Sequence, residues 1–199
     1  MLGIILSFSL HAQKPLKSKL FFDSIPERDT FKISNPLTSE LLAFFKSPYN
    51  IETIDKSSGR LIWDCRKIIP AKSYWHTTGG KSLYGTSFSC KKDKTPFMVS
   101  NFSNLKESGK ADALIEVFSS VREPLLKKND FINQTAKEIL ERFGNTFIKS
   151  GNYIVYHDYI DRLLVLYFSE GRVVFYRYTW LNKPVKTFMD IDKSILKTK

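Results

Sequence analysis

The apolar and polar positions of this chain are most regular in its C-terminal third. Thr135 and Glu138 have the spacing of a capping box, in which the threonine hydroxyl and the glutamate carboxylate each satisfy a free backbone donor at the start of a helix. The apolar positions that follow, Ile139, Leu140 and Phe143, lie on one side of such a helix. Gly144 suits the residue after the last turn. The pattern predicts a helix over 135–143.

Three segments after this helix alternate with the period of two that is typical of strands. They are 153–157, 163–168 and 173–180, and Ser169-Glu170-Gly171-Arg172 predicts a tight hairpin turn between the last two. Both faces of 163–168 are apolar, so we expect both to be covered. Helix 135–143 covers one face. The other meets the N-terminal half of the chain or a partner, and packing within the chain is the favoured alternative.

The N-terminal half predicts short strands and two helices. Thr38 can cap a helix over 38–46, and a second helix over 111–122 is predicted from apolar residues at helical spacing, which are Leu114, Phe118, Val121 and Leu125. Turn signals separate the predicted strands 61–69, 73–76, 82–90 and 96–102.

The fold class is therefore α+β, with antiparallel sheets, packed helices and a C-terminal helix followed by a three-stranded meander. We divide the chain into a signal peptide over 1–13, an N-terminal α+β region over 14–128 and a C-terminal αβββ region over 129–199.

The first 13 residues predict export. The uncharged apolar segment Leu2–Leu10 is followed by small Ala12 before Gln13, which is typical of a signal peptide, whereas a membrane span needs about 20 apolar residues. No Lys or Arg precedes the segment, and a buried strand over 4–10 is the alternative. Three lysines directly after the segment favour the signal peptide.

This prediction places the mature chain in the periplasm or outside the cell. No cysteine follows the apolar segment, so we expect no lipid anchor, and no other segment predicts a membrane span. These compartments hold no ATP or NAD pool, and we expect no cofactor.

The two cysteines, Cys65 and Cys90, predict one disulfide in an oxidising compartment. Both lie in predicted strands that can pair. Two buried free thiols are the alternative.

The formal net charge of +11 is compatible with an anionic partner such as nucleic acid. No run of five basic residues and no basic stripe is present, so lysines scattered over a solvated surface are the favoured interpretation. Arg172, Tyr176, Arg177 and Tyr178 interleave charge with aromatic rings, as single-strand binders do. Export and the lack of a nucleic-acid-binding motif argue against that partner.

The pattern Thr135-x-x-Glu138-Ile139-x-x-x-Phe143-Gly144, followed by aliphatic and aromatic strands, resembles the αβββ module of the BamE-like (SmpA/OmlA) envelope proteins over residues 131–181. The β-lactamase inhibitory proteins have a similar layout. Asn133 and Thr146 stand where glycine and proline are usual in the module. The resemblance implies a protein-binding module of the cell envelope without catalysis.

Catalytic motifs are weak. Thr78-Gly79-Gly80-Lys81-Ser82 is similar to the end of a phosphate-binding loop, but Trp75 replaces the required glycine and a strand follows, so a turn is favoured. His157 precedes Asp158 and Asp161 at a strand end, where the aspartates are ordinary turn residues and no metal site is expected.

The leading hypothesis is therefore an exported, non-enzymatic protein of the cell envelope or exterior that binds another protein. The possible binding surface consists of aromatic residues of the predicted meander, Tyr153, Tyr167, Tyr176, Tyr178 and Trp180. A secreted hydrolase with a site near His76 and His157 is one alternative, and a basic binder of nucleic acid or anionic polysaccharide is another.

Overall fold

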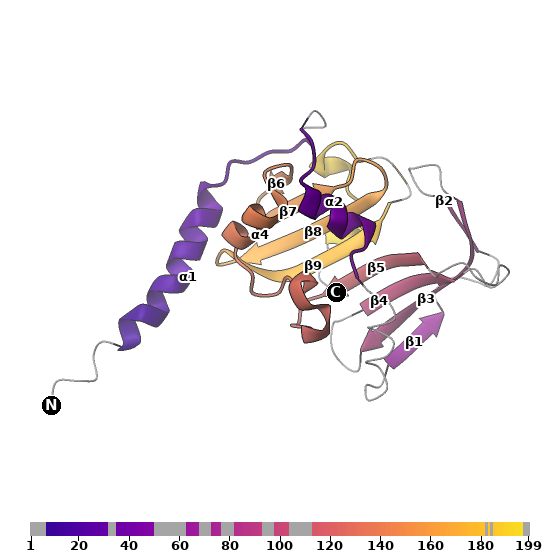
Figure 1. The fold of residues 1–199 in the computed structure, drawn as a ribbon, viewed down its shortest axis with the longest axis horizontal. Helices are drawn as coiled ribbons and strands as arrows, with labels where there is room; N and C mark the ends of the chain where they lie inside the picture. Colours follow the sequence, from indigo (N-terminus) through magenta and orange to yellow (C-terminus); the bar gives the residue numbers. More distant parts are fainter. Residues whose placement is uncertain are drawn as a thin grey trace.

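The computed structural model describes residues 7–31, 35–49, 63–67, 73–76, 82–92, 98–103, 113–181, 183 and 185–196. Within these residues, helices pack against one antiparallel sheet, which confirms the α+β class (Figure 1). The strand order is β1-β3-β4-β5-β9-β8-β7-β6, and β2 lies off this path and pairs with β3.

The N-terminal strands match four predicted segments closely. They are β1 (Trp63–Lys67), β2 (Ser73–His76), β3 (Ser82–Lys92) and β4 (Met98–Ser103). β5 (Ala113–Ser119) then pairs with β9 through Val117 opposite Tyr178, so strands from the regions 14–128 and 129–199 share one sheet.

The helix predicted over 111–122 is wrong, because β5 occupies this segment. Val117 is buried on the helix-covered side of the sheet, whereas the ring of Phe118 lies 5.0 Å from that of Phe175 on the opposite side. A central strand that is apolar on both faces loses the alternation by which strands are recognised, and its apolar positions can then fall at helical spacing. The central position of β5 in the sheet, and not the helical spacing of its apolar residues, therefore determines its conformation.

The C-terminal strands form a meander of four strands, where the sequence predicted three. The additional strand β6 (Ile148–Ser150) precedes β7 (Tyr153–His157), β8 (Arg162–Ser169) and β9 (Arg172–Trp180). β6 is too short to show an alternating pattern. The predicted hairpin turn joins β8 to β9, with Glu170 and Gly171 both at positive φ, as type I′ turns require.

Helix α4 (Ala136–Phe143) precedes the meander and has the predicted capping box. The Glu138 amide donates to Thr135 Oγ1 at 3.3 Å, and the Thr135 amide donates to Glu138 Oε2 at 2.6 Å. Gly144 ends the helix at φ 77°, and a Cβ there would lie 2.7 Å from the Thr38 methyl group. Thr38 caps α2 (Ser39–Lys46) and donates its hydroxyl to the Phe143 carbonyl, so the start of α2 is held at the end of α4.

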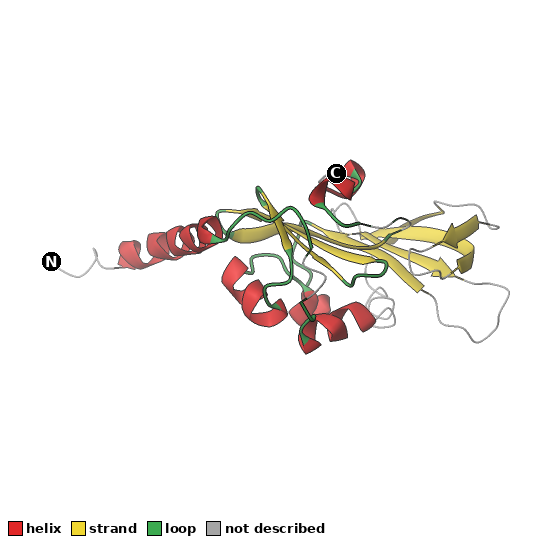
Figure 2. Cartoon of the chain, turned by 90° about the horizontal axis from the view of Figure 1, so that it is seen from above, coloured by secondary structure: helices red, strands yellow, loops and turns green. Residues whose placement is uncertain are grey.

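The helices and the chain ends lie on opposite faces of the sheet. Helices α2, α4 and the 3-10 helix η2 (Pro124–Asn129) cover one face, and the C-terminal segment with η3 (Phe188–Asp190) and α5 (Lys193–Leu196) covers the other (Figure 2). We call these the helix face and the strap face.

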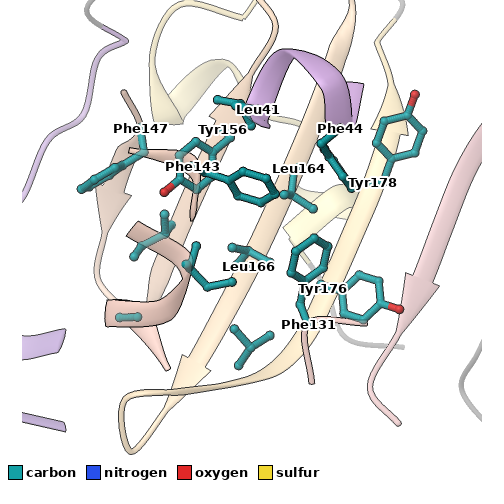
Figure 3. Close-up of a cluster of buried hydrophobic side chains, with 14 of the residues drawn as sticks. Leu41, Phe44, Phe131, Phe143, Phe147, Tyr156, Leu164, Leu166, Tyr176 and Tyr178 are labelled. Carbon is teal, nitrogen blue, oxygen red and sulfur yellow. The ribbon is translucent and has the colours of Figure 1, made fainter. Parts of the chain in front are cut away.

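The helix face carries an aromatic core. The ring of Phe44 lies 5.4 Å from that of Phe143, 5.7 Å from that of Phe131 and 6.0 Å from that of Tyr178 (Figure 3). These residues come from α2, α4, β9 and the segment before α4, so the core ties distant parts of the chain together.

Helix α1 (Ser7–Ser24) extends beyond the end of the sheet (Figure 1). Residues 7–10 belong to this helix. The alternative of a buried strand over 4–10 is therefore wrong for these four residues. Residues 1–6 lie outside the described part of the chain. None of the described helices is long and apolar enough to cross a membrane.

Candidate functional site

The five aromatic residues predicted as a possible binding surface are divided between the two faces of the sheet. Tyr176 and Tyr178 are buried in the aromatic core of the helix face (Figure 3). Trp180 is partly buried against this core. Tyr153 and Tyr167 lie on the strap face with their rings 4.9 Å apart. In this structure the five therefore do not form one exposed surface.

The polar atoms of Tyr153, Tyr178 and Trp180 make hydrogen bonds within the chain. Trp180 Nε1 donates to the Tyr178 hydroxyl at 2.8 Å, and the Tyr153 hydroxyl donates to the Leu196 carbonyl at 2.9 Å. Burial raises the pKa of the Tyr176 and Tyr178 hydroxyls, so both stay neutral over the physiological range. We interpret these residues as core and as anchors for the C-terminal segment.

The apolar strap face is covered by the chain itself. We use the name strap for residues 28–31 together with 185–196. Arg28 and Lys149 exchange two backbone hydrogen bonds at 2.9 Å, and the Phe188 amide donates to the Asp29 carbonyl at 2.8 Å. The apolar residues of the strap and the sheet form one buried cluster, which includes Phe31, Ile148, Val155, Leu163, Val165, Val185 and Ile191.

His157 lies at the end of β7 under the strap. Its ring centroid is 5.2 Å from that of Phe31, and its Nε2 atom is 3.9 Å from Asp158 Oδ1, which is beyond hydrogen-bond distance. Burial lowers the pKa of His157, although the charges of Asp158 and Asp161 act in the opposite direction. A neutral imidazole is therefore favoured at neutral pH.

Asp158 organises the turn after β7, as the sequence predicted for a turn residue. Its Oδ1 atom accepts the backbone N–H groups of Ile160, Asp161 and Arg162, each at 2.9 Å. The Arg162 guanidinium lies 5.0 Å from the Trp180 ring centroid and donates to the Phe45 carbonyl. Among the described residues, no group of three or more His, Cys, Asp or Glu side chains can hold a metal ion.

His76 and His157 do not lie together. His76 ends β2 and His157 ends β7, with β3, β4, β5, β9 and β8 between these strands in the sheet. At about 4.8 Å between neighbouring strands, the two backbones are separated by roughly 25–30 Å. The described sheet therefore does not bring His76 and His157 together.

The glycine-rich segment 78–82 also fails the requirement of a phosphate-binding loop. Residues 77–81 lie outside the described part of the chain, but β3 begins at Ser82. The loop requires a helix at this point, so the prediction of a strand after the glycines is confirmed.

Helix α1 offers exposed apolar side chains. Leu16 and Leu20 are 58% and 60% exposed, and they lie one helical turn apart on the same side of α1. Lys17 beside them is exposed as well. This leucine pair is our candidate functional site.

The C-terminal end of α1 attaches the helix that carries the leucine pair to the body of the protein. The Phe22 ring stacks on that of Phe168 at 4.8 Å, and Lys19 Nζ lies 3.2 Å from Glu170 Oε1. A Cβ at Gly171 would lie 2.2 Å from the Ser18 carbonyl oxygen, so only glycine permits this close approach of the β8–β9 turn to α1. These contacts begin at Ser18, after the predicted cleavage position.

The leucine pair is not evident from the sequence. Segment 14–24 contains Pro15 and three lysines and has no regular apolar stripe, so its sequence does not predict a helix. The one available signal was the spacing of Leu16 and Leu20, which is shared by many buried helices and cannot distinguish an exposed pair from core.

In comparisons with family models, curated proteins and solved structures, none was found to match this chain.

Proposed function

We propose that this chain is an exported, non-enzymatic protein that acts by binding another protein in the periplasm or outside the cell. The observation that carries the proposal is the leucine pair of α1, Leu16 and Leu20, which are both more than half exposed on a helix that extends from the body. Burial of two such side chains in an apolar groove of a partner would contribute roughly 1–2 kcal/mol each.

The position of Pro15 supports removal of residues 1–13. In the uncleaved chain Pro15 lies inside α1, where it cannot donate a backbone hydrogen bond to the carbonyl four residues earlier. After cleavage near Gln13, Pro15 would lie in the first helical turn, where the backbone N–H groups have no partner within the helix and proline is well tolerated. The helix that remains keeps the leucine pair and its contacts with the body.

The charge of the helix indicates the chemistry of the partner. Lys17 accompanies the leucine pair, and the whole chain carries a formal net charge of +11. We therefore expect an apolar groove with a rim of carboxylates, because opposite charges increase the rate of encounter and fix orientation.

The arrangement of α4 with β7, β8 and β9 gives secondary support. We propose that this unit corresponds to the αβββ module that residues 131–181 resemble, with β6 as an added strand. That resemblance implies protein binding in the cell envelope.

The experiment compares L16S/L20S with L42S in affinity capture from periplasmic and outer-membrane fractions. Leu42 is a matched control, because it is 51% exposed and lies on a different helix, α2. We expect the wild type and L42S to retain the same specific partner and L16S/L20S to lose it, with unchanged thermal unfolding in all three. Capture of no specific partner, or equal capture by L16S/L20S, would contradict the proposal.

A further inference from the structure

The chain has two cysteines, and the sheet places them opposite each other. Cys65 in β1 pairs with Cys90 in β3, within five consecutive pairs that run from Trp63 opposite Lys92 to Lys67 opposite Phe88 without a register shift.

This register fits the geometry of a disulfide bond. Directly opposed residues of an antiparallel pair have Cα atoms about 4.5–5.5 Å apart, and disulfides span Cα separations of about 4.4–6.8 Å. A slip of one residue would move one cysteine by about 3.4 Å along its strand and to the other face of the sheet. Only the observed register, or one very close to it, permits the bond.

We propose that Cys65 and Cys90 form an intramolecular disulfide that fastens β1 to β3. β1 stands at one end of the strand order, and among the described strands it pairs with β3 alone. The bond would fix the register of this edge strand and close the segment 66–89, which contains β2. Closing such a segment stabilises the native state mainly by restricting the unfolded chain.

The reaction is thiol–disulfide exchange. The thiolate of one cysteine attacks an external disulfide, forms a mixed disulfide and releases one external thiolate. The thiolate of the second cysteine then attacks the sulfur of the first cysteine in the mixed disulfide and releases the other external thiolate. The two cysteines together lose two electrons and two protons, and the external disulfide is reduced to two thiols. In the cell the oxidant would be a protein disulfide of the export compartment, so this step rests on the proposed export, whereas the pairing itself rests on the register alone.

The experiment starts from the purified full chain, which is fully reduced and then exposed under native conditions to oxidised glutathione. We expect an intact mass lower by two hydrogen atoms than that of the reduced chain, no reaction with iodoacetamide, and two alkylated cysteines after reduction. Hydrogen exchange should be slower in 63–67 in the oxidised chain and unchanged in 153–180.

The matched control is C65S/R66C, which keeps two cysteines but moves one to the position opposite Ser89. We expect this variant to keep free thiols or glutathione adducts. A wild-type chain that stays reduced, or a control that forms the intramolecular bond equally well, would overturn the proposal.

A second arm separates the pairing from export. The chain is expressed in a bacterial host from residue 1 and from residue 14, and its thiols are alkylated at lysis. An oxidised product from the first form and a reduced product from the second support both proposals. If both products are reduced while glutathione still forms the bond, the pairing holds and the proposed export is overturned.

Discussion

The two faces of the C-terminal sheet are both covered by the chain, but by different means. The helix face is covered by α2, α4 and η2 over a core of interlocking aromatic rings. The strap face is covered by short segments that pack on mainly aliphatic residues. Three polar residues of the sheet, His157, Arg177 and Thr179, are also buried on this face.

Hydrogen bonds supplement the smaller apolar cluster of the strap. Arg177 lies 3.1 Å from Glu116 through Nε and donates to the Ser194 carbonyl through a terminal nitrogen at 2.5 Å. η3 and α5 contain three and four residues, which is too short for a helix to be stable by itself. The comparison therefore indicates that the helix face is secured by a large aromatic core, whereas the short strap combines a smaller apolar cluster with hydrogen bonds to the sheet.

The largest effect is expected for Phe143→Ala on the helix face. Phe143 is fully buried against Phe44, Phe131 and Tyr156, and removal of a phenylalanine ring from such a core costs about 3–5 kcal/mol. Urea denaturation measures the free energy of unfolding. Leu42→Ala serves as the control on the exposed side of α2 and should change this free energy by less than about 0.5 kcal/mol. A loss below about 1 kcal/mol for Phe143→Ala would show that the aromatic core is loosely packed.

A smaller loss is expected for Ile191→Ala on the strap face. Ile191 is buried, but it lies on a short segment that can move inward to fill part of the cavity, so we expect about 2 kcal/mol. Hydrogen exchange should become faster in 185–196 and stay unchanged in 136–143. A loss as large as that of Phe143→Ala, with faster exchange in both segments, would remove the distinction between the faces.

Thr135→Ala tests the capping box at the start of α4. The substitution removes the hydroxyl that accepts the Glu138 amide, and loss of such a cap costs about 1 kcal/mol. Thermal unfolding gives the effect, and Thr135→Ser is the conservative control that keeps the hydroxyl. Equal destabilisation by both variants would assign the loss to packing of the threonine methyl group.

The smallest effect is expected from pH. The pKa of His157 is lowered in the folded state, so the unfolded chain binds more protons than the folded chain once the pH falls below about 6.5. The free energy of unfolding therefore decreases as the pH falls from about 6.5 through the folded-state pKa. The charges of Asp158 and Asp161 oppose this lowering of the pKa. The rings of Phe31 and Tyr159 also contact the His157 ring.

His157→Gln should reduce the pH dependence of the free energy of unfolding between pH 7 and 5, as measured by urea denaturation at each pH. As the pH is lowered from 7 to 5, the strap of the wild type should lose protection from hydrogen exchange at a higher pH than α4 does. An identical pH profile for the wild type and His157→Gln would show that His157 does not contribute to this dependence.

Local signals predicted much of the fold. The Thr135–Glu138 capping box, the cap at Thr38 and the hairpin turn at Glu170 and Gly171 each depend on a few neighbouring residues, and the structure has all three. β5 was mistaken for a helix because its burial on both faces is set by distant parts of the chain.

The candidate site was less accessible from sequence. Apolar alternation predicted that the second face of the meander needs a cover, but not that residues 28–31 and 185–196 would provide it. The leucine pair of α1 resembles core residues in sequence, and its exposure is decided by where Phe22 and Ser18 meet the β8–β9 turn.

The most direct test of the proposed binding site is photo-crosslinking from single positions in cells. p-Benzoylphenylalanine replaces Leu16, Leu20 or Leu42 in the exported chain, and the products are identified after irradiation. We predict one common crosslinked protein from positions 16 and 20 and none from position 42. The absence of a product at 16 and 20, or the same product at all three positions, would contradict binding through the leucine pair of α1.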